Sequence, residues 1–289
     1  MSDNNSIIRL ALPKGRMQDG VLELLADAGI KVRSGARDYR PSISLNGFEV
    51  KILKPQNIVE MLQAGSRDIG FTGADWVAEL NAELTELLDT GLDPVKMVVA
   101  APSELLTNGN LPQRTLVVAS EYERLAKQWL KKKNISATFV RSYGATEVFP
   151  PEDGDLIVDL TATGATLRAN KLDILDEVMT SSTRLYANPA ALKIPEKRKA
   201  IEGLVLLMRS VLEARRRVMV EVNVPSDKLE SVIEILPCMR EPTLSQLHGG
   251  SGYAVKAAVP IELLPNVIPE IKRRGGTDVV VAKLAQIVP

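Results

Sequence analysis

Residues 155–168 constrain the fold most, because a short apolar run between two aspartates leads there into a loop of small and hydroxylated residues. The run 156–158, Leu-Ile-Val, is typical of a buried parallel strand, and residues 167–170 suit the first turn of a helix. Between them, residues 161–166 read Thr-Ala-Thr-Gly-Ala-Thr. Backbone N–H groups around a glycine beside a helix N-terminus form an anion cradle, and threonine hydroxyls add donors. The segment therefore predicts a strand, a phosphate-binding loop and a helix in succession.

The two flanking aspartates extend this prediction from a phosphate to a phosphorylated sugar. Asp155 and Asp159 point to the same side of the strand because side chains alternate, and Asp159, at the carboxyl end, can reach over the loop. The alternative is an ordinary strand–turn–helix in which Thr163 or Thr166 only caps the helix. No Gly-Lys-Ser/Thr follows the loop and no Gly-x-Gly-x-x-Gly is present, so a Walker loop and a dinucleotide-binding turn are both excluded.

Composition narrows the class of protein further. Lys plus Arg and Asp plus Glu are both 36, so the net charge of +0 argues against a nucleic-acid or membrane partner. Cys238 and His248 are the only residues of their kinds, which excludes an intramolecular disulfide and a cysteine-based zinc site, and no nucleophile elbow accompanies the histidine. The polar first residues lack signal-peptide features, and no segment approaches 18 apolar residues. We expect a cytoplasmic protein.

Alternating strands and helices over the first 190 residues predict an α/β fold with a parallel sheet covered by helices on both faces. The expected strands are 7–12, 48–53, 68–71, 97–101, 115–119, 137–140 and the run before the Thr/Gly loop; the expected helices are 21–28, one from 55, 76–80, 121–133 and 144–149. The pattern restarts after residues 91–96, which predicts two lobes with a ligand cleft at the carboxyl ends of the strands. Residues 172–187 are expected to cross back, and a helix over 196–217 to pack on the first lobe. The predicted domains are lobe I, 1–95 with 187–217; lobe II, 96–186; and a C-terminal domain, 218–289.

Residues 218–289 follow a different pattern. Strands are expected at 218–224, 242–247, 253–259 and 277–282, and helices at 226–236 and 261–274. The order β-α-β-β-α-β is that of the ferredoxin-like split unit. By analogy alone, such a domain at the end of an enzyme is often a small-molecule sensor.

Four stretches resemble ATP phosphoribosyltransferase, the family that begins histidine biosynthesis. They are Leu-Ala-Leu-Pro-Lys-Gly-Arg at 10–16, Asp-Ile-Gly-Phe-Thr-Gly-Ala-Asp at 68–75, Asp-Leu-Ile-Val-Asp-Leu at 155–160 and Thr-Gly-Ala-Thr-Leu-Arg-Ala-Asn at 163–170. Arg-Glu-Pro-Thr-Leu-Ser at 240–245 is similar to the long form, which carries its own regulatory domain. One departure is Gly-Leu-Asp-Pro-Val-Lys at 91–96, where the family more often has a Gly-Phe-Gly-like turn.

The resemblance implies a periplasmic-binding-protein-like catalytic part of two lobes, followed by a ferredoxin-like regulatory domain. It implies that N1 of ATP displaces pyrophosphate from phosphoribosyl pyrophosphate to give phosphoribosyl-ATP. Magnesium on the pyrophosphate oxygens fits this chemistry, because Mg²⁺ usually binds through substrate phosphates and few carboxylates. The resemblance also implies feedback inhibition by histidine and a homo-oligomer, a dimer or a hexamer.

Site residues follow from these motifs as hypotheses. Residues expected to bind phosphoribosyl pyrophosphate are Asp155, Asp159, Thr161, Ala162, Thr163, Gly164, Ala165 and Thr166, with Asp159 on the ribose hydroxyls and Asp155 mainly supporting the strand. Residues expected near the nucleotide are Lys14, Gly15, Arg16, Thr72, Gly73 and Asp75. Those expected to act in the reaction are Lys14, Arg16 and Asp159. A solvated loop lysine is the alternative for Lys14, and a helix N-cap is the alternative for Asp75. Expected regulatory residues are Ser245, His248, Gly250 and Ser251.

The sequence is compatible with two other functions. A non-catalytic, two-lobed small-molecule-binding protein, or the effector domain of a regulator, would share the lobes and the cleft. The lack of an export signal weakens the first, and no helix-turn-helix precedes the lobes to support the second. A different phosphoribosyltransferase is the other alternative, but most of those place two adjacent acids before the loop, whereas here a single Asp159 is followed by Leu160 and Thr161.

Overall fold

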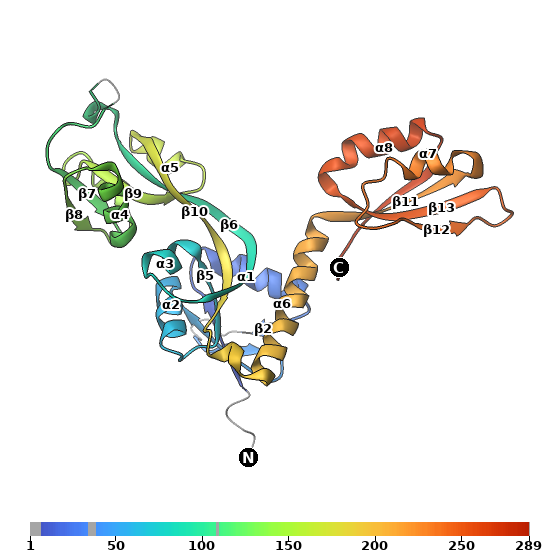
Figure 1. The fold of residues 1–289 in the computed structure, drawn as a ribbon, viewed down its shortest axis with the longest axis horizontal. Helices are drawn as coiled ribbons and strands as arrows, with labels where there is room; N and C mark the ends of the chain where they lie inside the picture. Colours follow the sequence, from blue (N-terminus) through green and yellow to red (C-terminus); the bar gives the residue numbers. More distant parts are fainter. Residues whose placement is uncertain (1–6, 34–38, 108–109, 289) are drawn as a thin grey trace, which may run out of the picture. The chain divides into compact units, whose positions relative to one another are not determined.

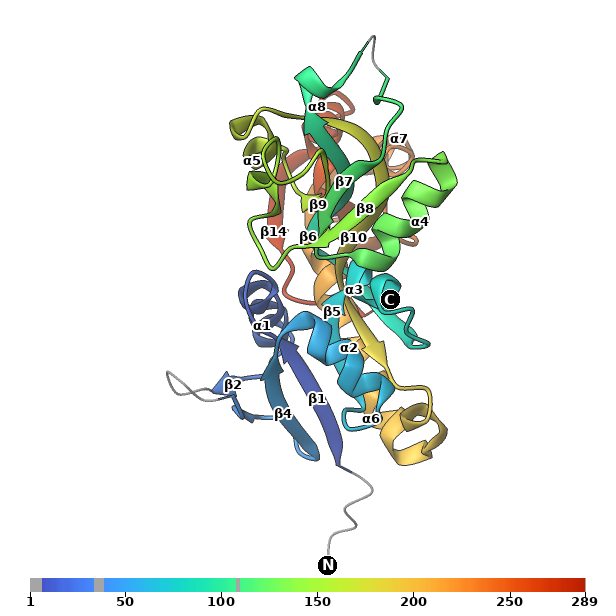
Figure 2. The ribbon, with the colours of Figure 1, turned by 90° about the vertical axis from the view of Figure 1, so that its left-hand side faces the viewer.

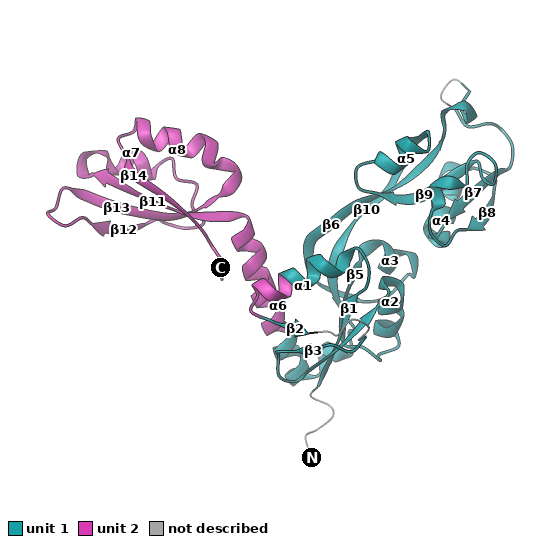
Figure 3. Cartoon of the chain, turned by 180° about the vertical axis from the view of Figure 1, so that it is seen from behind, with its two compact units in different colours: residues 1–23, 30–201 teal, residues 24–29, 202–289 magenta. Residues whose placement is uncertain are grey.

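The computed structural model describes residues 7–33, 39–107 and 110–288. The chain forms two compact units, residues 1–23 with 30–201 and residues 24–29 with 202–289 (Figures 1 and 3). The division passes through helix α1 (Met17–Asp27), whose last turn groups with helix α6 (Pro195–Arg215).

The first unit is built on one eight-stranded sheet with the order β4-β1-β5-β10-β6-β9-β7-β8. The strands are β1 Ile8–Pro13, β4 Phe48–Leu53, β5 Ile69–Gly73, β6 Thr85–Pro102, β7 Leu116–Ser120, β8 Ala137–Arg141, β9 Leu156–Thr161 and β10 Leu172–Ala187. The helices are α2 Pro55–Gln63, α3 Ala74–Glu79, α4 Glu123–Lys133 and α5 Ala165–Ala169. Strands β2 (Val32–Arg33) and β3 (Ser42–Ile43) form a separate ribbon. The α/β class predicted from the sequence is confirmed.

Two parallel groups of strands lie on either side of the long antiparallel pair β6–β10 (Figure 2). We call β4-β1-β5 with α2 and α3 the first lobe, and β9-β7-β8 with α4 and α5 the second lobe. In the first lobe, β1 is paired in parallel with both β4 and β5. In the second, β7 is paired in parallel with both β8 and β9. The chain therefore passes between the lobes twice, outward on β6 and back on β10.

The register shows that the carboxyl ends of the two groups face each other. Gly73, the last residue of β5, is paired with Thr183 of β10. Thr161, the last residue of β9, is paired with Lys96 of β6, which is paired with Thr180 of β10. Strand β5 runs toward lower residue numbers of β10 and β9 toward higher ones, so the two strands end about 10 Å apart along β10. This head-on arrangement brings the strand ends of both lobes together at one place.

The segments that pass between the lobes are longer strands than the sequence predicts. Residues 172–187, expected to cross back, form the 16-residue strand β10. Residues 91–96, expected to join two units, lie inside the 18-residue strand β6. Gly91 and Asp93 there have positive φ angles of 66° and 48°, and register shifts interrupt the pairing with β10. These irregularities and the many polar residues hide the strand from a pattern search.

Each lobe has its own apolar contacts with the sheet. In the second lobe, Trp129 and Leu130 of α4 pack on Leu116, Val118 and Val158. In the first lobe, Ile58 and Leu62 of α2 pack with Ala11 and Tyr186. A Cβ atom at Gly70 would lie 2.6 Å from the Ile58 side chain, so only glycine permits this approach of α2 to β5.

The C-terminal part of the second unit is a ferredoxin-like sheet, as predicted. Its elements are β11 Arg217–Pro225, α7 Leu229–Ile233, β12 Thr243–Gln246, β13 Gly252–Pro260, α8 Leu264–Arg273 and β14 Thr277–Lys283. The strand order is β12-β13-β11-β14, and every neighbouring pair is antiparallel. Val218, Val220, Val222 and Val224 of β11 are buried in one core with α7 and α8 residues, which is the period-two pattern of a half-covered sheet.

Candidate active site

The Thr/Gly loop lies between β9 and α5, as the sequence predicts. Its own threonines hold it: the N–H of Gly164 donates to Oγ1 of Thr161 at 2.9 Å, and the N–H of Ala165 donates to Oγ1 of Thr163 at 3.4 Å. Gly164 has a φ of 74°, and a Cβ atom there would lie 2.8 Å from the Arg168 guanidinium. Thr163 and Thr166 are exposed. The amides of Gly164 and Ala165 are used within the loop, so the donors that it presents to solvent are the hydroxyls of Thr163 and Thr166 and the first-turn amide of Thr166, which has no intrahelical acceptor.

Asp159 lies beside this loop without a cationic partner. It is half-buried, and within the described part of the chain its carboxylate accepts one bond, from the N–H of Leu160 at 2.7 Å. Burial, together with the nearby Glu147 and Glu121 carboxylates, raises the pKa of Asp159 to about 6. An acceptor held without a counter-ion suits hydroxyl groups or a metal ion supplied by a ligand.

Asp155 is not brought to the loop, which favours its expected role in supporting the strand over its place among the residues expected to bind the substrate. Arg114 donates to its two oxygens at 2.9 and 2.6 Å, and the N–H of Val117 donates to it at 2.8 Å. These bonds lower the pKa of Asp155. Four residues of strand separate it from Asp159, about 13 Å. Its carboxylate is therefore a structural partner at the amino end of β9.

The Lys14-Gly15-Arg16 turn lies at the carboxyl end of β1, as expected. The N–H of Lys14 donates to the carbonyl of Leu53 at 2.8 Å, and Gly15 has a φ of 89°. The Lys14 ammonium donates to the Tyr39 hydroxyl at 3.0 Å and lies 5.0 Å from the centre of its ring. Lys14 and Arg16 are exposed, and neither forms an ion pair with a residue that the structure describes. Both cations are available to an anionic ligand.

Thr72 and Gly73 lie at the carboxyl end of β5, on the same edge as Lys14. The Thr72 hydroxyl is buried and donates to the carbonyl of Pro55 at 3.1 Å, so it stabilises the start of α2. Gly73 is the N-cap residue of α3, and a Cβ atom there would lie 2.1 Å from Oδ1 of Asp75. Only their backbone atoms remain for a nucleotide.

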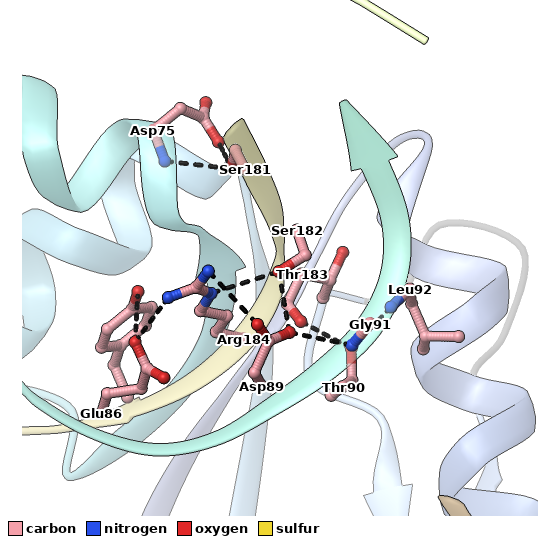
Figure 4. Close-up of polar contacts among 11 residues, drawn as sticks. Asp75, Glu86, Asp89, Thr90, Gly91, Leu92, Ser181, Ser182, Thr183 and Arg184 are labelled. Atoms are coloured by element: carbon pink, nitrogen blue, oxygen red, sulfur yellow. Dashed lines mark hydrogen bonds and ion pairs between the residues drawn. The ribbon is translucent and has the colours of Figure 1, made fainter. Parts of the chain in front are cut away.

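Asp75 is neither exposed to a ligand nor the helix cap that formed the alternative. It is buried, and its carboxylate accepts from the Ser181 hydroxyl at 2.5 Å (Figure 4) and from the Tyr122 hydroxyl at 2.9 Å. Its N–H donates to the same serine at 3.1 Å. Burial, with the Asp75 carboxylate beside it, raises the pKa of Tyr122, which keeps the phenol protonated as a donor. Asp75 therefore joins the first lobe to β10 and to the second lobe.

A polar network that the sequence did not predict holds β6 to β10 (Figure 4). Arg184 pairs with Glu86 at 2.8 Å and with Asp89 at 3.2 Å, and Asp89 also accepts from the Ser182 hydroxyl at 2.8 Å. Thr183 donates to Asp93 at 2.8 Å. The sequence shows only that residues 85–93 and 180–184 are rich in polar side chains. That the two stretches pair with each other is visible only in the structure.

The predicted regulatory residues lie in the C-terminal unit at the end of β12 and in the turn that follows it. Ser245 is in β12, while His248, Gly250 and Ser251 belong to the turn before β13, where Gly249 and Gly250 have positive φ angles. A cavity of about 270 Å³ lies elsewhere on this unit. Its lining includes Met219, Cys238, Arg240, Thr243, Lys256 and Val288, and none of the four predicted residues.

Two properties of the described residues bear on partners. None of their helices is both long enough and apolar enough to span a bilayer. They contain no group of three His, Cys, Asp or Glu side chains arranged to hold a metal ion by itself.

Comparison with known proteins identifies the family. A family model described as ATP phosphoribosyltransferase matches residues 54–210, and one described as HisG, C-terminal domain, matches residues 214–286. The ATP phosphoribosyltransferase of Chlorobaculum parvum is 34% identical over 284 residues, 96% of this chain and 97% of its own. That of Pelotomaculum thermopropionicum is 32% identical over 287 residues, 98% of this chain and 99% of its own.

A solved structure agrees with these relatives. A chain of an ATP phosphoribosyl transferase (HisG:HisZ) complex from Thermotoga maritima superposes with a TM-score of 0.64 and 25% identity, covering 72% of this chain and 99% of that one. The chain therefore belongs to the ATP phosphoribosyltransferase family, in the long form with a C-terminal domain, and it is a transferase. The resemblance carried by the four sequence stretches is confirmed.

Proposed function

We propose that the chain transfers the 5-phosphoribosyl group of phosphoribosyl pyrophosphate to N1 of ATP, as the first step of histidine biosynthesis. One observation supports this most strongly. An unpaired Asp159 and a loop of N–H and hydroxyl donors end β9, while Lys14 and Arg16 end β1, at carboxyl ends that the sheet register turns toward each other. The donors suit a phosphate, the carboxylate suits ribose hydroxyls, and the cations suit polyphosphates.

The reaction needs charge placement more than proton transfer. N1 of the adenine attacks the anomeric carbon, its lone pair forms the new bond, and the bond to the pyrophosphate oxygen breaks with its electrons leaving on pyrophosphate. The loop 161–166 holds the 5-phosphate, and Asp159 accepts from ribose hydroxyls. Because its pKa is about 6, Asp159 is mostly ionised at neutral pH. Lys14 and Arg16 neutralise the polyphosphates, and positioning of both substrates contributes most of the acceleration.

The carboxylate oxygens near Asp159 fit a magnesium ion that is bound mainly by the phosphates of the substrate. Asp159, Glu147 and Glu121 lie close enough for their charges to interact, and carboxylate oxygens are the protein ligands that Mg²⁺ prefers. When bound, the ion offsets the charge of the leaving pyrophosphate. The protein residues would supply at most a few of its ligands.

We also propose that residues 218–289 bind histidine and regulate the enzyme. Residues 1–95 and 187–217 would then form catalytic lobe I, and residues 96–186 would form lobe II. The ferredoxin-like unit is complete by itself, with its own core. We further propose a cytoplasmic homo-oligomer, a dimer or a hexamer. Removal of 218–289 should abolish inhibition by histidine and retain ATP binding, a change in coupling of about 1–3 kcal/mol. The measurement is the ratio of rates with and without histidine, and equal inhibition of the truncated chain would contradict the assignment.

The direct test of function is incubation with ATP, phosphoribosyl pyrophosphate and magnesium. We expect an adduct that absorbs in the near ultraviolet, with release of pyrophosphate in equal amount. Omission of either substrate is the control. Binding of both substrates without product would instead support a non-catalytic two-lobed binding protein, and product from a base other than ATP would support a different phosphoribosyltransferase.

A further inference from the structure

Helix α4 of the second lobe begins without a capping side chain of its own. The residue before its first turn is Tyr122, whose side chain makes no capping hydrogen bond and whose hydroxyl is directed at Asp75. The next two free amides, of Arg124 and Leu125, donate to the two carboxylate oxygens of Glu79 at 2.9 and 3.0 Å. The cap of α4 is therefore supplied by a residue more than forty positions earlier in the chain.

Glu79 belongs to the other lobe, at the end of α3. It is buried, with 7% of its surface exposed, and the α4 residue Arg124 reciprocates by donating to the carbonyl of Ala78 at 2.5 Å and to Oδ1 of Asn81 at 2.7 Å. Figure 2 shows α3 beside the start of α4. The Glu79 carboxylate and the Arg124 guanidinium thus each take their hydrogen bonds from the opposite lobe. Such charge-assisted bonds at a helix N-terminus are among the stronger polar contacts.

Asp75 and Glu79 lie one helical turn apart on α3, so both reach the same segment of the second lobe. Asp75 holds Tyr122, and Glu79 holds the two residues that begin α4. That segment directly follows β7, whose last residue, Ser120, is paired with Val158 and donates to its carbonyl at 2.5 Å. Val158 precedes Asp159. The chain of contacts from Asp75 and Glu79 through Ser120 therefore reaches Val158, the residue next to the proposed ribose-binding Asp159.

We propose that Glu79 is a positioning residue for phosphoribosyl transfer, which holds the second lobe at the angle where its phosphate loop faces the Lys14 turn of the first. The inference rests on the proposed function, because it concerns the same two-substrate site. Glu79 touches neither reacting group. The proposed contacts to the 5-phosphate and the ribose lie within the second lobe, so Glu79 affects the placement of the two substrates more than the binding of either.

The experiment compares Glu79→Ala and Glu79→Gln with Glu60→Ala, an exposed glutamate of α2 whose side chain, among the residues that the structure describes, accepts only from Asn57. Turnover of Glu79→Ala should fall about ten- to a hundredfold, since small misplacements of reacting atoms are that costly. The dissociation constant of phosphoribosyl pyrophosphate alone should change less than about threefold, because its loop lies in one lobe. Glu79→Gln keeps one acceptor oxygen and should be intermediate.

A second readout does not depend on activity. Spin labels at the exposed positions Gln63 of α2 and Lys132 of α4, in a Cys238→Ser background, report the distance between the lobes. The distance distribution should broaden in Glu79→Ala and remain narrow in Glu60→Ala. If Glu79→Ala does not fold, Glu79→Gln and Glu79→Asp give the same comparison.

The outcomes separate the two proposals. Turnover of Glu79→Ala equal to that of Glu60→Ala, an unchanged distance distribution, or a loss of turnover explained by weaker binding of one substrate would overturn the positioning role. If the unmodified chain forms no phosphoribosyl-ATP, the proposed function is wrong, and the distance distribution still decides whether Glu79 fixes the lobes.

Discussion

The amino ends and the carboxyl ends of the parallel strands hold their charges in opposite ways. At the amino end of β5, Asp68 accepts from Arg9 and from Lys197 at 2.9 Å, with only 5% and 6% of the Asp68 and Lys197 side chains exposed. At the amino end of β9, Asp155 pairs with Arg114. At the carboxyl ends, Asp159 and Arg16 form no ion pair within the described part of the chain. A fold that pairs its charges at one edge and leaves them free at the other reserves the second edge for a ligand.

The largest test of this difference is Asp68→Ala. Removal of one partner from a buried ion pair leaves Arg9 and Lys197 uncompensated, so the free energy of unfolding should fall by about 3–5 kcal/mol. Turnover per folded molecule should be nearly unchanged, since this edge is remote from the loop. Urea unfolding together with active-site titration measures both. A strong loss of turnover in fully folded Asp68→Ala protein would erase the distinction between the edges.

Asp159→Asn should show the reverse behaviour. Loss of the carboxylate should reduce turnover by about a hundredfold, in the range found for one directed polar group in a transition state. Thermal stability at pH 7 should be equal or higher, because a half-buried carboxylate without a cation is unfavourable. A fall in turnover that merely tracks a fall in melting temperature would make the residue structural.

The pH dependence of Asp159 sharpens the same test. Its pKa of about 6 is above that of the unfolded chain, so the folded state binds the proton more tightly. Its contribution to stability therefore falls as pH rises from about 4 to about 6 and is constant above. The stability of the unmodified chain relative to Asp159→Asn should decline by up to about 2–3 kcal/mol across that window. A difference independent of pH would contradict the unpaired state of Asp159.

Thr166→Val tests the loop with a smaller change. The substitution keeps the volume and β-branching and deletes one hydroxyl donor, so folding should persist. Binding of phosphoribosyl pyrophosphate should weaken by about 1.5–3 kcal/mol, the range for hydrogen bonds to charged groups. Thr138→Val, at an exposed position of β8, is the matched control. An unchanged Michaelis constant for this substrate would remove the Thr166 hydroxyl from the phosphate site.

Asp155→Asn should have the smallest effect, although it lies on the same strand as Asp159. Its partner Arg114 has a half-exposed side chain, so the loss should be about 1 kcal/mol in unfolding free energy. Turnover should be unchanged. A loss of turnover comparable to that of Asp159→Asn would restore Asp155 to the substrate site.

Sequence reasoning succeeds here where the information is local. The Thr/Gly loop, the Lys14 turn and the ferredoxin-like order depend on residues that are neighbours in the chain, so alternation, glycine and proline positions suffice. It fails where a side chain's partner is distant. Alternation places Asp155 and Asp159 on the same side of the strand, but the partner of Asp155, Arg114, lies 41 residues away and is visible only in the structure. The hydroxyl of Ser181, 106 residues away, donates to the Asp75 carboxylate and so keeps it from a ligand.

The full lengths of β6 and β10 are not predicted for a similar reason. Residues 85–93 of β6 and 180–184 of β10 carry the polar network between the two strands, so these parts show no apolar run. Only the buried run 97–101 of β6 has that pattern, and it is the part that the sequence predicts as a strand. Helix α4 gives the converse lesson. The residues Ser120-Glu121-Tyr122-Glu123 have the spacing of a local capping box, but Ser120 accepts from the N–H of Tyr122, and the amides of Arg124 and Leu125 are capped by Glu79 of the other lobe.

The pairing of β6 with β10 also defines how the chain is assembled from simpler parts. Pro102 and Leu172 are register partners, so residues 103–171 leave and rejoin the rest of the chain at a single point of the sheet. Paired residues on antiparallel strands are about 5 Å apart, a gap that a two-residue hairpin can close. Most of the second lobe is thus an insertion within a hairpin. A shortened chain in which that hairpin replaces 103–171 would keep the first lobe's strands and their order, with the Lys14 turn and without the phosphate loop.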